Sequence, residues 1–292
     1  MTDFDALHER VRSIGWGSYL TGKELIVVEA SSTRSVLSSV PTIQSISQNA
    51  LFSTITTPNY TNDTEVHVLI LIIDDIAHIL LDVTGDPLHK RGYRRESGEA
   101  PMKENLAAAL LAFANWKYKS PLLDPFCGSG TIAIEAAMMA RNIAPGLFRS
   151  FRIEELPFHN ATLLESVRAN AEKKIYPSGN YTIHASDIDP AMIQIARENA
   201  RRAGVAEDIV FSVSDFLSSL TSELNPIIIT NPPYGNRLQS DDLDGIYTRL
   251  LGEIQRNGGG CITTYGVDVR YGLANRKLLN GGEECRFWFK KS

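Results

Sequence analysis

The hydrophobic positions of the first 85 residues follow two different periods. Residues 4–13 have apolar side chains three or four positions apart, which is the spacing of an amphipathic helix. Two apolar segments, 66–73 and 76–83, flank Asp74-Asp75, and this arrangement predicts a β-hairpin. Together these patterns predict a small α+β domain. Its other predicted elements are a strand within 24–30 and a helix from Pro41 to about Phe52.

From residue 101 onward, short apolar segments alternate with longer amphipathic ones. Residues 121–123 are typical of a short buried strand, and residues 241–256 place their apolar side chains on one face of a helix. Because strands separated by helices usually pair in parallel, we expect an α/β fold with a mostly parallel, doubly wound sheet. The other predicted helices are 102–116, 129–141, 160–174 and 189–203, and the other predicted strands are 181–185, 209–213, 226–229, 261–264 and 283–289.

A polar, basic and glycine-containing stretch separates the two patterns. We therefore expect a first domain over 1–85, a linker over 86–100 and a second domain over 101–292. Cationic side chains in this linker can neutralise the phosphates of a nucleic acid, and a tyrosine among them can stack on a base. A solvated linker is the alternative interpretation. The residues that we predict to bind nucleic acid here, and RNA if the resemblance given below holds, are Lys90, Arg91, Tyr93, Arg94 and Arg95.

Composition and charge change this picture only slightly. The chain has 292 residues, of which 43% are hydrophobic and 22% charged, as in an ordinary globular protein. Its net charge of −5 does not favour nucleic-acid binding. The three cysteines are widely spaced and fit neither a disulfide framework nor a zinc site, so we expect reduced cysteines, no metal and a cytoplasmic location. No apolar run approaches the ~20 residues that span a bilayer, so we expect no membrane association.

The first predicted strand of the second domain leads into a glycine-rich turn. Glycines let the backbone pass close to a ligand, and the helix that follows offers free N–H groups and a partial positive charge. A carboxylate such as that of the methionine part of S-adenosylmethionine suits this turn, whereas the sequence matches neither a P-loop nor the dinucleotide fingerprint. A tight strand-to-helix turn without a ligand is the alternative. The predicted cofactor residues here are Asp124, Pro125, Phe126, Gly128, Ser129 and Gly130.

The next two predicted strands also end in acidic residues. Asp187 lies at a strand end, where a carboxylate can accept both ribose hydroxyls of an adenosine. Asp189 precedes Pro190 and is suited to capping the next helix. Asp215 can accept from an adenine amino group, and Phe216 can pack on the adenine face. Each residue alone is as typical of a surface loop; the prediction rests on successive strand ends that carry adenosine contacts in order.

The fourth strand end carries Asn231, Pro232, Pro233 and Tyr234. The side-chain oxygen of the asparagine and the carbonyl of the next proline can both accept from one exocyclic amino group, and the tyrosine can lie against the ring. An ordinary turn is the alternative. We interpret these four residues as the catalytic residues of methyl transfer to a nucleobase nitrogen. The motif fits the amino groups of guanine and adenine equally, so the residues alone do not separate the two bases.

Taken together, these segments resemble the THUMP-containing RNA guanine-N2 methyltransferases, whose bacterial members modify 23S ribosomal RNA. Many relatives carry the looser label of N6-adenine-specific DNA methylase. The resemblance implies a Rossmann-like class I methyltransferase with S-adenosyl-L-methionine as its cofactor, and a partial THUMP-like RNA-binding domain over 1–85. The segments that carry it are 85–94, 100–104, 124–130, 187–190, 231–234 and the tail at 277–281, which is similar to the family's closing hairpin.

We therefore expect methyl transfer from S-adenosylmethionine to the exocyclic N2 of a guanine in RNA, with ribosomal RNA as the first expectation. The alternative substrate is adenine N6 in DNA or RNA. A non-catalytic RNA-binding factor of ribosome assembly is the alternative of another class. Members of the family normally have a ferredoxin-like segment before the region that corresponds to residue 1. We accordingly also expect a member that needs a partner or modifies a smaller substrate such as tRNA.

Overall fold

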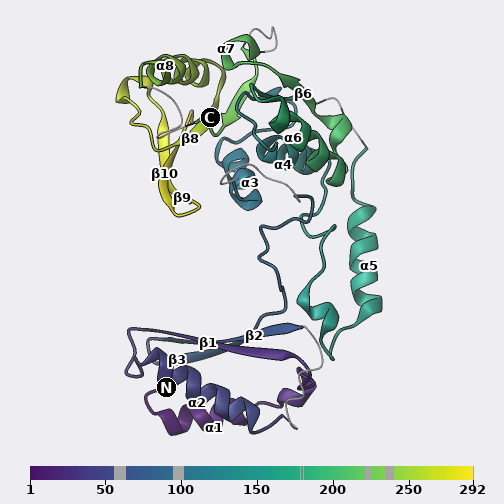
Figure 1. Cartoon of the computed structure of the whole chain (residues 1–292), viewed down its shortest axis with the longest axis vertical. Coiled ribbons are helices and arrows are strands. Elements are labelled where there is room, and N and C mark those ends of the chain that lie inside the picture. Colours follow the sequence, from purple (N-terminus) through teal and green to yellow (C-terminus); the bar gives the residue numbers. More distant parts are fainter. Residues whose placement is uncertain are drawn as a thin grey trace. The chain divides into compact units, whose positions relative to one another are not determined.

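The computed structural model describes residues 1–55, 64–94, 102–177, 179, 181–220, 225–233 and 240–291. The chain forms two compact units, and each unit is made of two separate segments of the chain (Figure 1). The first unit is Met1–Pro87 together with Ser150–Val167, and the second is Leu88–Arg149 together with Arg168–Ser292. The sequence pattern by itself assigns 150–167 to the second domain, whereas its contacts place it in the first unit.

The described part of the first unit is built on a three-stranded sheet in the order β1-β2-β3. The first two strands are parallel, and the last two are antiparallel. The helices α1 and α2 pack on each other, and α2 also packs on β1. The bounds are α1 Phe4–Arg12, β1 Leu25–Thr33, α2 Val40–Phe52, β2 Glu65–Ile73 and β3 Ile76–Leu81.

Local chemistry explains where these elements begin and turn. The side chain of Asp3 accepts hydrogen bonds from the backbone N–H groups of Asp5 and Ala6 and thereby caps α1. Asp74 and Asp75 have φ angles of 50° and 61°, a conformation that suits the tight hairpin turns in which aspartate is common. The predicted helix and the predicted hairpin are therefore both confirmed.

The segment Ser150–Val167 joins the first unit through specific contacts. It contains a 3₁₀ turn, η2, at Arg152–Glu155, and it leads into α5 at Ala161–Glu172. The N–H of Ile153 donates to the carbonyl of Val83 at 2.9 Å. Leu156 is 3% exposed and packs in the core of the first unit.

A seven-stranded sheet forms the centre of the described second unit, in the order β6-β5-β4-β7-β8-β10-β9. The strands from β6 to β8 are parallel, whereas β10 runs antiparallel to β8 and to β9. The strand bounds are β4 Leu122–Asp124, β5 Ile183–Asp187, β6 Val210–Val213, β7 Ile227–Thr230, β8 Gly259–Thr263, β9 Ala274–Asn280 and β10 Glu283–Phe289.

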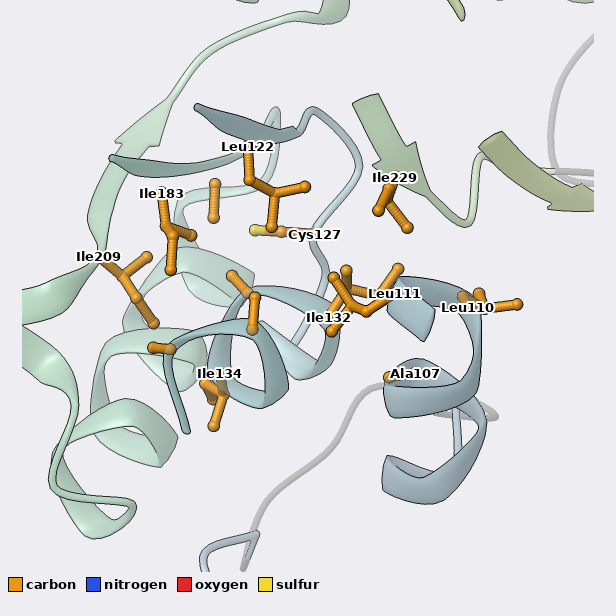
Figure 2. Close-up of a cluster of buried hydrophobic side chains, with 14 of the residues drawn as sticks. Ala107, Leu110, Leu111, Leu122, Cys127, Ile132, Ile134, Ile183, Ile209 and Ile229 are labelled. Carbon is orange, nitrogen blue, oxygen red and sulfur yellow. The ribbon is translucent and has the colours of Figure 1, made fainter. Parts of the chain in front are cut away.

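Both faces of this sheet are covered, because neighbouring strand residues belong to different cores. Leu122 packs with residues of α3, α4 and α6, several of which are drawn in Figure 2, whereas Leu123 packs with residues of α7 and α8. Ile229 and Ile228 divide between the same two cores. This arrangement confirms the expected doubly wound α/β fold. The helix bounds are α3 Glu104–Phe113, α4 Thr131–Ala140, α6 Pro190–Arg202, α7 Phe216–Ser219 and α8 Ser240–Asn257, and the remaining 3₁₀ turns are η1 Trp16–Ser18, η3 Ala206–Asp208 and η4 Val269–Tyr271.

The strand order reverses between β4 and β7. From β4 the chain adds β5 and then β6 on one side, and it returns to place β7 on the other side of β4. In open parallel sheets, ligands bind beyond the carboxyl ends of the strands at such a switch point. The strand ends that meet there are Asp124 and Thr230.

The described residues show neither a helix that could cross a membrane nor a metal-binding cluster. Among them, no helix combines the necessary length with the necessary apolar character. The same residues contain no group of three or more His, Cys, Asp or Glu side chains that could hold a metal ion.

Candidate active site

The glycine-rich turn after β4 contains two glycines, and the structure favours glycine at these two positions for different reasons. Gly130 has a φ of 83°, and a Cβ added there would lie 3.0 Å from the Cβ of Ala196 on α6. Gly128 has a φ of 50°, and a Cβ there would meet no heavy atom within 4 Å. Gly130 therefore permits close packing of α4 on α6, whereas Gly128 leaves open space beside the backbone, which suits a ligand that approaches the turn.

The start of α4 is suited to an anionic group. Its N-cap residue is Gly130, which offers no side chain to accept from the first N–H groups of the helix. The carbonyl of the predicted cofactor residue Ser129 accepts a 3.2 Å hydrogen bond from the buried Asn199 side chain, which fixes the turn from behind. Unsatisfied helix N–H groups and the helix dipole together favour a carboxylate at this position.

Asp187 connects this turn to the end of β5. Its two carboxylate oxygens accept from the N–H of Gly128 at 2.9 Å and from the N–H of Asp189 at 3.0 Å. Each oxygen has a further lone pair, so the carboxylate can still accept from hydroxyl groups of a ligand. Asp189 caps α6 through a 2.8 Å bond from the N–H of Ala191, as the sequence predicts.

Asp124 is a buried carboxyl group at the switch point. It is 1% exposed, and its Oδ1 accepts a 2.6 Å hydrogen bond from the hydroxyl of Thr230. Burial raises the pKa of Asp124 to about 7, and the negative charge of Asp187 acts in the same direction, whereas the hydrogen bond from Thr230 opposes the rise. Pro125, which follows, is also buried. Asp124 therefore changes charge near neutral pH inside the predicted cofactor region.

The structure gives Asp215 and Phe216 intramolecular roles that the sequence analysis did not predict. Asp215 is exposed and caps α7, because its oxygens accept from the N–H of Ser218 at 3.0 Å and from its hydroxyl at 2.5 Å. Phe216 is 5% exposed, and its ring stacks on Phe126 with the centroids 5.2 Å apart. The adenine contacts expected of Asp215 and Phe216 stay predictions.

Asn231, Pro232 and Pro233 follow β7 directly. The side-chain oxygen of Asn231 is buried and has no hydrogen-bond partner within the described structure. Pro232 is buried, and the carbonyl of Pro233 accepts from the Tyr247 hydroxyl. An unsatisfied buried acceptor costs about 1–3 kcal/mol, so it marks a place where a ligand can donate. Tyr234, the fourth predicted catalytic residue, lies outside the described residues.

The basic segment is largely turned inward, which corrects the prediction for Tyr93. The Tyr93 ring is 1% exposed, and its hydroxyl donates to Glu135 at 3.2 Å, so the ring cannot stack on a base. Arg91 pairs with the same carboxylate at 3.5 Å. Burial raises the pKa of Glu135 to about 7, and the positive charge of Arg91 opposes this shift. Lys90 is exposed, as expected for contact with RNA, and Arg95 lies outside the described residues.

Arg94 connects the basic segment to the cofactor turn. Its guanidinium donates to the hydroxyl of Thr131, the first residue of α4, at 2.6 Å, and to the carbonyl of Met102 at 2.8 Å. It also lies 3.8 Å from the buried carboxylate of Glu104. Sequence reasoning missed this role. The sequence did contain a signal for it. The apolar helices α3 and α4 each hold a single acidic residue, and such a buried acid requires a cationic partner.

The fold and this site define a class I methyltransferase, and comparison with known proteins gives its family. The RMKL-like methyltransferase domain matches residues 91–267. The chain belongs to this family of methyltransferases.

Two curated relatives show how this chain compares with longer proteins. The Bacillus subtilis (strain 168) protein named "Putative RNA methyltransferase YpsC" is 42% identical over 245 residues, which is 80% of this chain and 63% of the relative. The ribosomal RNA large subunit methyltransferase K/L of Vibrio parahaemolyticus is 39% identical over 204 residues, which is 68% of this chain and 29% of that protein. The matched part thus spans less than two thirds of either relative.

Two solved structures are similar over almost the whole chain. SMU.472, described as "a putative methyltransferase complexed with SAH" (S-adenosylhomocysteine), has a TM-score of 0.82 at 33% identity, and the match covers 99% of this chain and 80% of that one. A Listeria monocytogenes protein described as "a predicted N6-adenine-specific DNA methylase" has a TM-score of 0.86 at 30% identity, and the match covers 100% of this chain and 80% of that one. Because SAH is what remains of S-adenosylmethionine after methyl transfer, the cofactor prediction is confirmed at the level of the family.

Proposed function

We propose that this protein transfers a methyl group from S-adenosylmethionine to the exocyclic N2 of a guanine in RNA, with ribosomal RNA as the substrate class. The family supports the reaction class, and the large-subunit methyltransferase K/L relative supports ribosomal RNA. One observation supports the amino group of a base as the methyl acceptor: the buried Asn231 Oδ1 has no hydrogen-bond partner in the described structure.

Because of Asn231, the site requires a ligand that can donate a hydrogen bond. Its amide oxygen is an acceptor, so a ligand that donates an N–H satisfies it whereas a carbonyl or a phosphate does not. The amino group of a purine is such a donor, and the carbonyl of Pro232 can accept its second hydrogen. Holding both hydrogens in this way turns the nitrogen lone pair out of conjugation with the ring. To reach the site, the base must leave its stack at a cost of a few kcal/mol.

The glycine turn and Asp187 would hold the cofactor. The start of α4 would receive its carboxylate, and the remaining lone pairs of Asp187 would accept from its ribose hydroxyls. S-adenosylmethionine supplies an electrophilic methyl group on a positively charged sulfur. The contribution of the protein is to position the two groups, and no strong general base is required because the nitrogen can lose its proton after it is alkylated.

The test combines nucleoside analysis with one variant. RNA from a strain that lacks the gene should lose N2-methylguanosine, measured by mass spectrometry of digested ribosomal RNA. In vitro, Asn231→Ala should reduce the rate of methyl transfer by about 100-fold, the order expected when one positioned polar contact of the transition state is lost. Its affinity for SAH should stay within about twofold of wild type, because Asn231 lies outside the glycine turn. Full activity of Asn231→Ala would refute the assignment.

Adenine N6 is the second candidate, and the name of the similar Listeria structure favours it. The same mass spectra separate the two bases, because loss of N6-methyladenosine or N6-methyldeoxyadenosine with unchanged N2-methylguanosine would identify adenine. A thermal-shift titration with S-adenosylmethionine tests the non-catalytic alternative. Absence of any stabilisation would support an RNA-binding factor that has kept only the fold.

We also propose that the first unit is a partial THUMP-like domain that contacts RNA. The support is the α+β arrangement of its three strands and two helices. Photo-crosslinking to 4-thiouridine-labelled ribosomal RNA, followed by peptide mapping, should recover peptides from Met1–Pro87. Crosslinks confined to peptides of the second unit would contradict this role.

A further inference from the structure

Tyr247 of α8 forms a hydrogen bond with Pro233, which follows the predicted base-binding residues Asn231 and Pro232. It is 1% exposed, and its hydroxyl oxygen lies 3.3 Å from the carbonyl oxygen of Pro233. The same hydroxyl lies 2.7 Å from the hydroxyl of Thr263 at the end of β8. The N–H of Tyr265 donates to the Thr263 hydroxyl at 2.9 Å. Four residues thus form one connected series of hydrogen bonds.

The direction of these hydrogen bonds is fixed by the two ends of the series. The carbonyl of Pro233 can only accept, so the Tyr247 hydroxyl must donate to it. The hydroxyl of Thr263 must then donate to Tyr247, while it accepts from the N–H of Tyr265. Hydrogen bonds that run in one direction polarise and strengthen one another.

The ring of Tyr247 is held as firmly as its hydroxyl. It stacks on the ring of Tyr265 with the centroids 4.1 Å apart and the planes at 8°. Thr263 is fully buried, and Tyr247 packs in the core between α8 and the sheet. The hydroxyl therefore has little freedom to leave Pro233, and the proline rings fix φ at positions 232 and 233.

We propose that Tyr247 is a positioning residue for the target base, an inference that rests on the proposed function. Its hydrogen bond takes one of the two lone pairs of the Pro233 carbonyl oxygen and fixes the orientation of that peptide group. The side chain of Asn231 and the carbonyl of Pro232, which come just before this fixed peptide group in the chain, are then held in place to receive the amino group. Tyr247 thus sets the direction of the acceptors without touching the substrate.

The test variant is Tyr247→Phe, which keeps the stacked ring and removes the hydroxyl. The kcat for methyl transfer to RNA should fall by about 10-fold. The base should still bind, but its amino group should be oriented less accurately toward the methyl group. The affinity for SAH should stay within about twofold of wild type. Tyr265→Phe is the matched control, since the Tyr265 hydroxyl bonds Asp244 instead of this series, and its kcat should not change. Thr263→Val should lower kcat, and Thr263→Ser, which keeps the hydroxyl, should retain it.

A second measurement does not depend on activity. Hydrogen–deuterium exchange of the peptide that contains Asn231 should be faster in Tyr247→Phe than in wild type and unchanged in Tyr265→Phe. If wild-type protein methylates no RNA but this exchange difference appears, the proposed function fails while the role of Tyr247 in holding the segment stands. A wild-type kcat or unchanged exchange in Tyr247→Phe, or an equal loss of activity in Tyr265→Phe, would overturn the inference.

Discussion

The hydroxyl of Thr230 donates a 2.6 Å hydrogen bond to Asp124 and joins the carboxyl ends of β7 and β4. Thr230 is fully buried, and Asp124 is 1% exposed. Asp124 leads into the glycine turn, and Thr230 directly precedes Asn231. One buried contact thus connects the predicted cofactor residues with the predicted base residues at the point where the strand order reverses.

Removing this hydrogen bond should destabilise the second unit in a pH-dependent way. Thr230→Val has nearly the same shape but no donor, and it should lower the free energy of unfolding by about 1–3 kcal/mol. The loss should be larger at pH 8 than at pH 5, because an ionised Asp124 accepts more strongly. Urea unfolding at both pH values measures it. Thr230→Ser loses a methyl group but keeps the donor, so its cost should not depend on pH; the same pH dependence in both variants would contradict this reading.

Asp124 should also make the protein less stable as the pH rises toward neutrality. Its pKa is raised from an ordinary 3.8 to about 7. Between these values the unfolded chain has released a proton that the folded chain keeps, so the stabilising contribution is complete below about pH 4 and is lost by about pH 7. In Asp124→Asn the free energy of unfolding should fall less steeply between pH 4 and pH 7. Urea titrations across this range check the slope.

Glu135 provides a second test of the same effect, because its pKa is also raised, from 4.5 to about 7. Glu135→Gln should reduce the slope over nearly the same pH range, and the double variant should reduce it further. An unchanged slope in Asp124→Asn would show that the folded protein ionises this carboxyl normally.

The two glycines of the turn should respond differently to substitution. Gly128→Ala should weaken SAH binding by at least about 10-fold, because a methyl group enters the open space and φ is unfavourable for alanine. Gly204→Ala is the matched control, since its φ of 71° is similarly unfavourable and its Cβ also meets no atom within 4 Å. Isothermal titration should find unchanged SAH affinity in Gly204→Ala. Equal weakening in both variants would assign the effect to backbone strain alone.

Gly130→Ala should act on stability rather than only on binding. Its Cβ would approach the Cβ of Ala196 at 3.0 Å, so α4 and α6 must separate slightly. We expect a melting temperature below that of Gly128→Ala, whose added methyl group meets no atom. A higher melting temperature for Gly130→Ala would contradict the packing argument.

Substitutions of Lys90 and Arg94 should separate an effect on RNA binding from an effect on stability. Arg94→Ala removes the buried ion pair with Glu104 and the hydrogen bond to Thr131, and it should lower the free energy of unfolding by about 3 kcal/mol. Lys90→Ala should change stability by less than about 0.5 kcal/mol, because the side chain is exposed. If Lys90 contacts a phosphate, its removal should weaken RNA binding and reduce the slope of log affinity against log salt by about 1. Unchanged RNA affinity and salt dependence in Lys90→Ala would exclude it from the interface.

The sequence by itself determined the alternation of helices and strands and the order of the strand ends. Periodicity sets which face of each element is buried, and local rules place the cap at Asp189 and the turn at Asp74-Asp75. Asn231, Asp187 and the glycine turn could be found because each lies at the end of an apolar strand. Their approach then follows from the geometry of a parallel sheet.

Only the tertiary structure decided what each side chain contacts. Tyr93 and Arg91 look like exposed basic-segment residues until Glu135, more than 40 positions away, is seen to bind both. The Tyr247 hydroxyl reaches Pro233 only because α8 packs against the strand that precedes the proline. A periodic pattern records how much surface a residue must bury but not which distant residue covers it, since that partner is chosen by the packing of the whole chain.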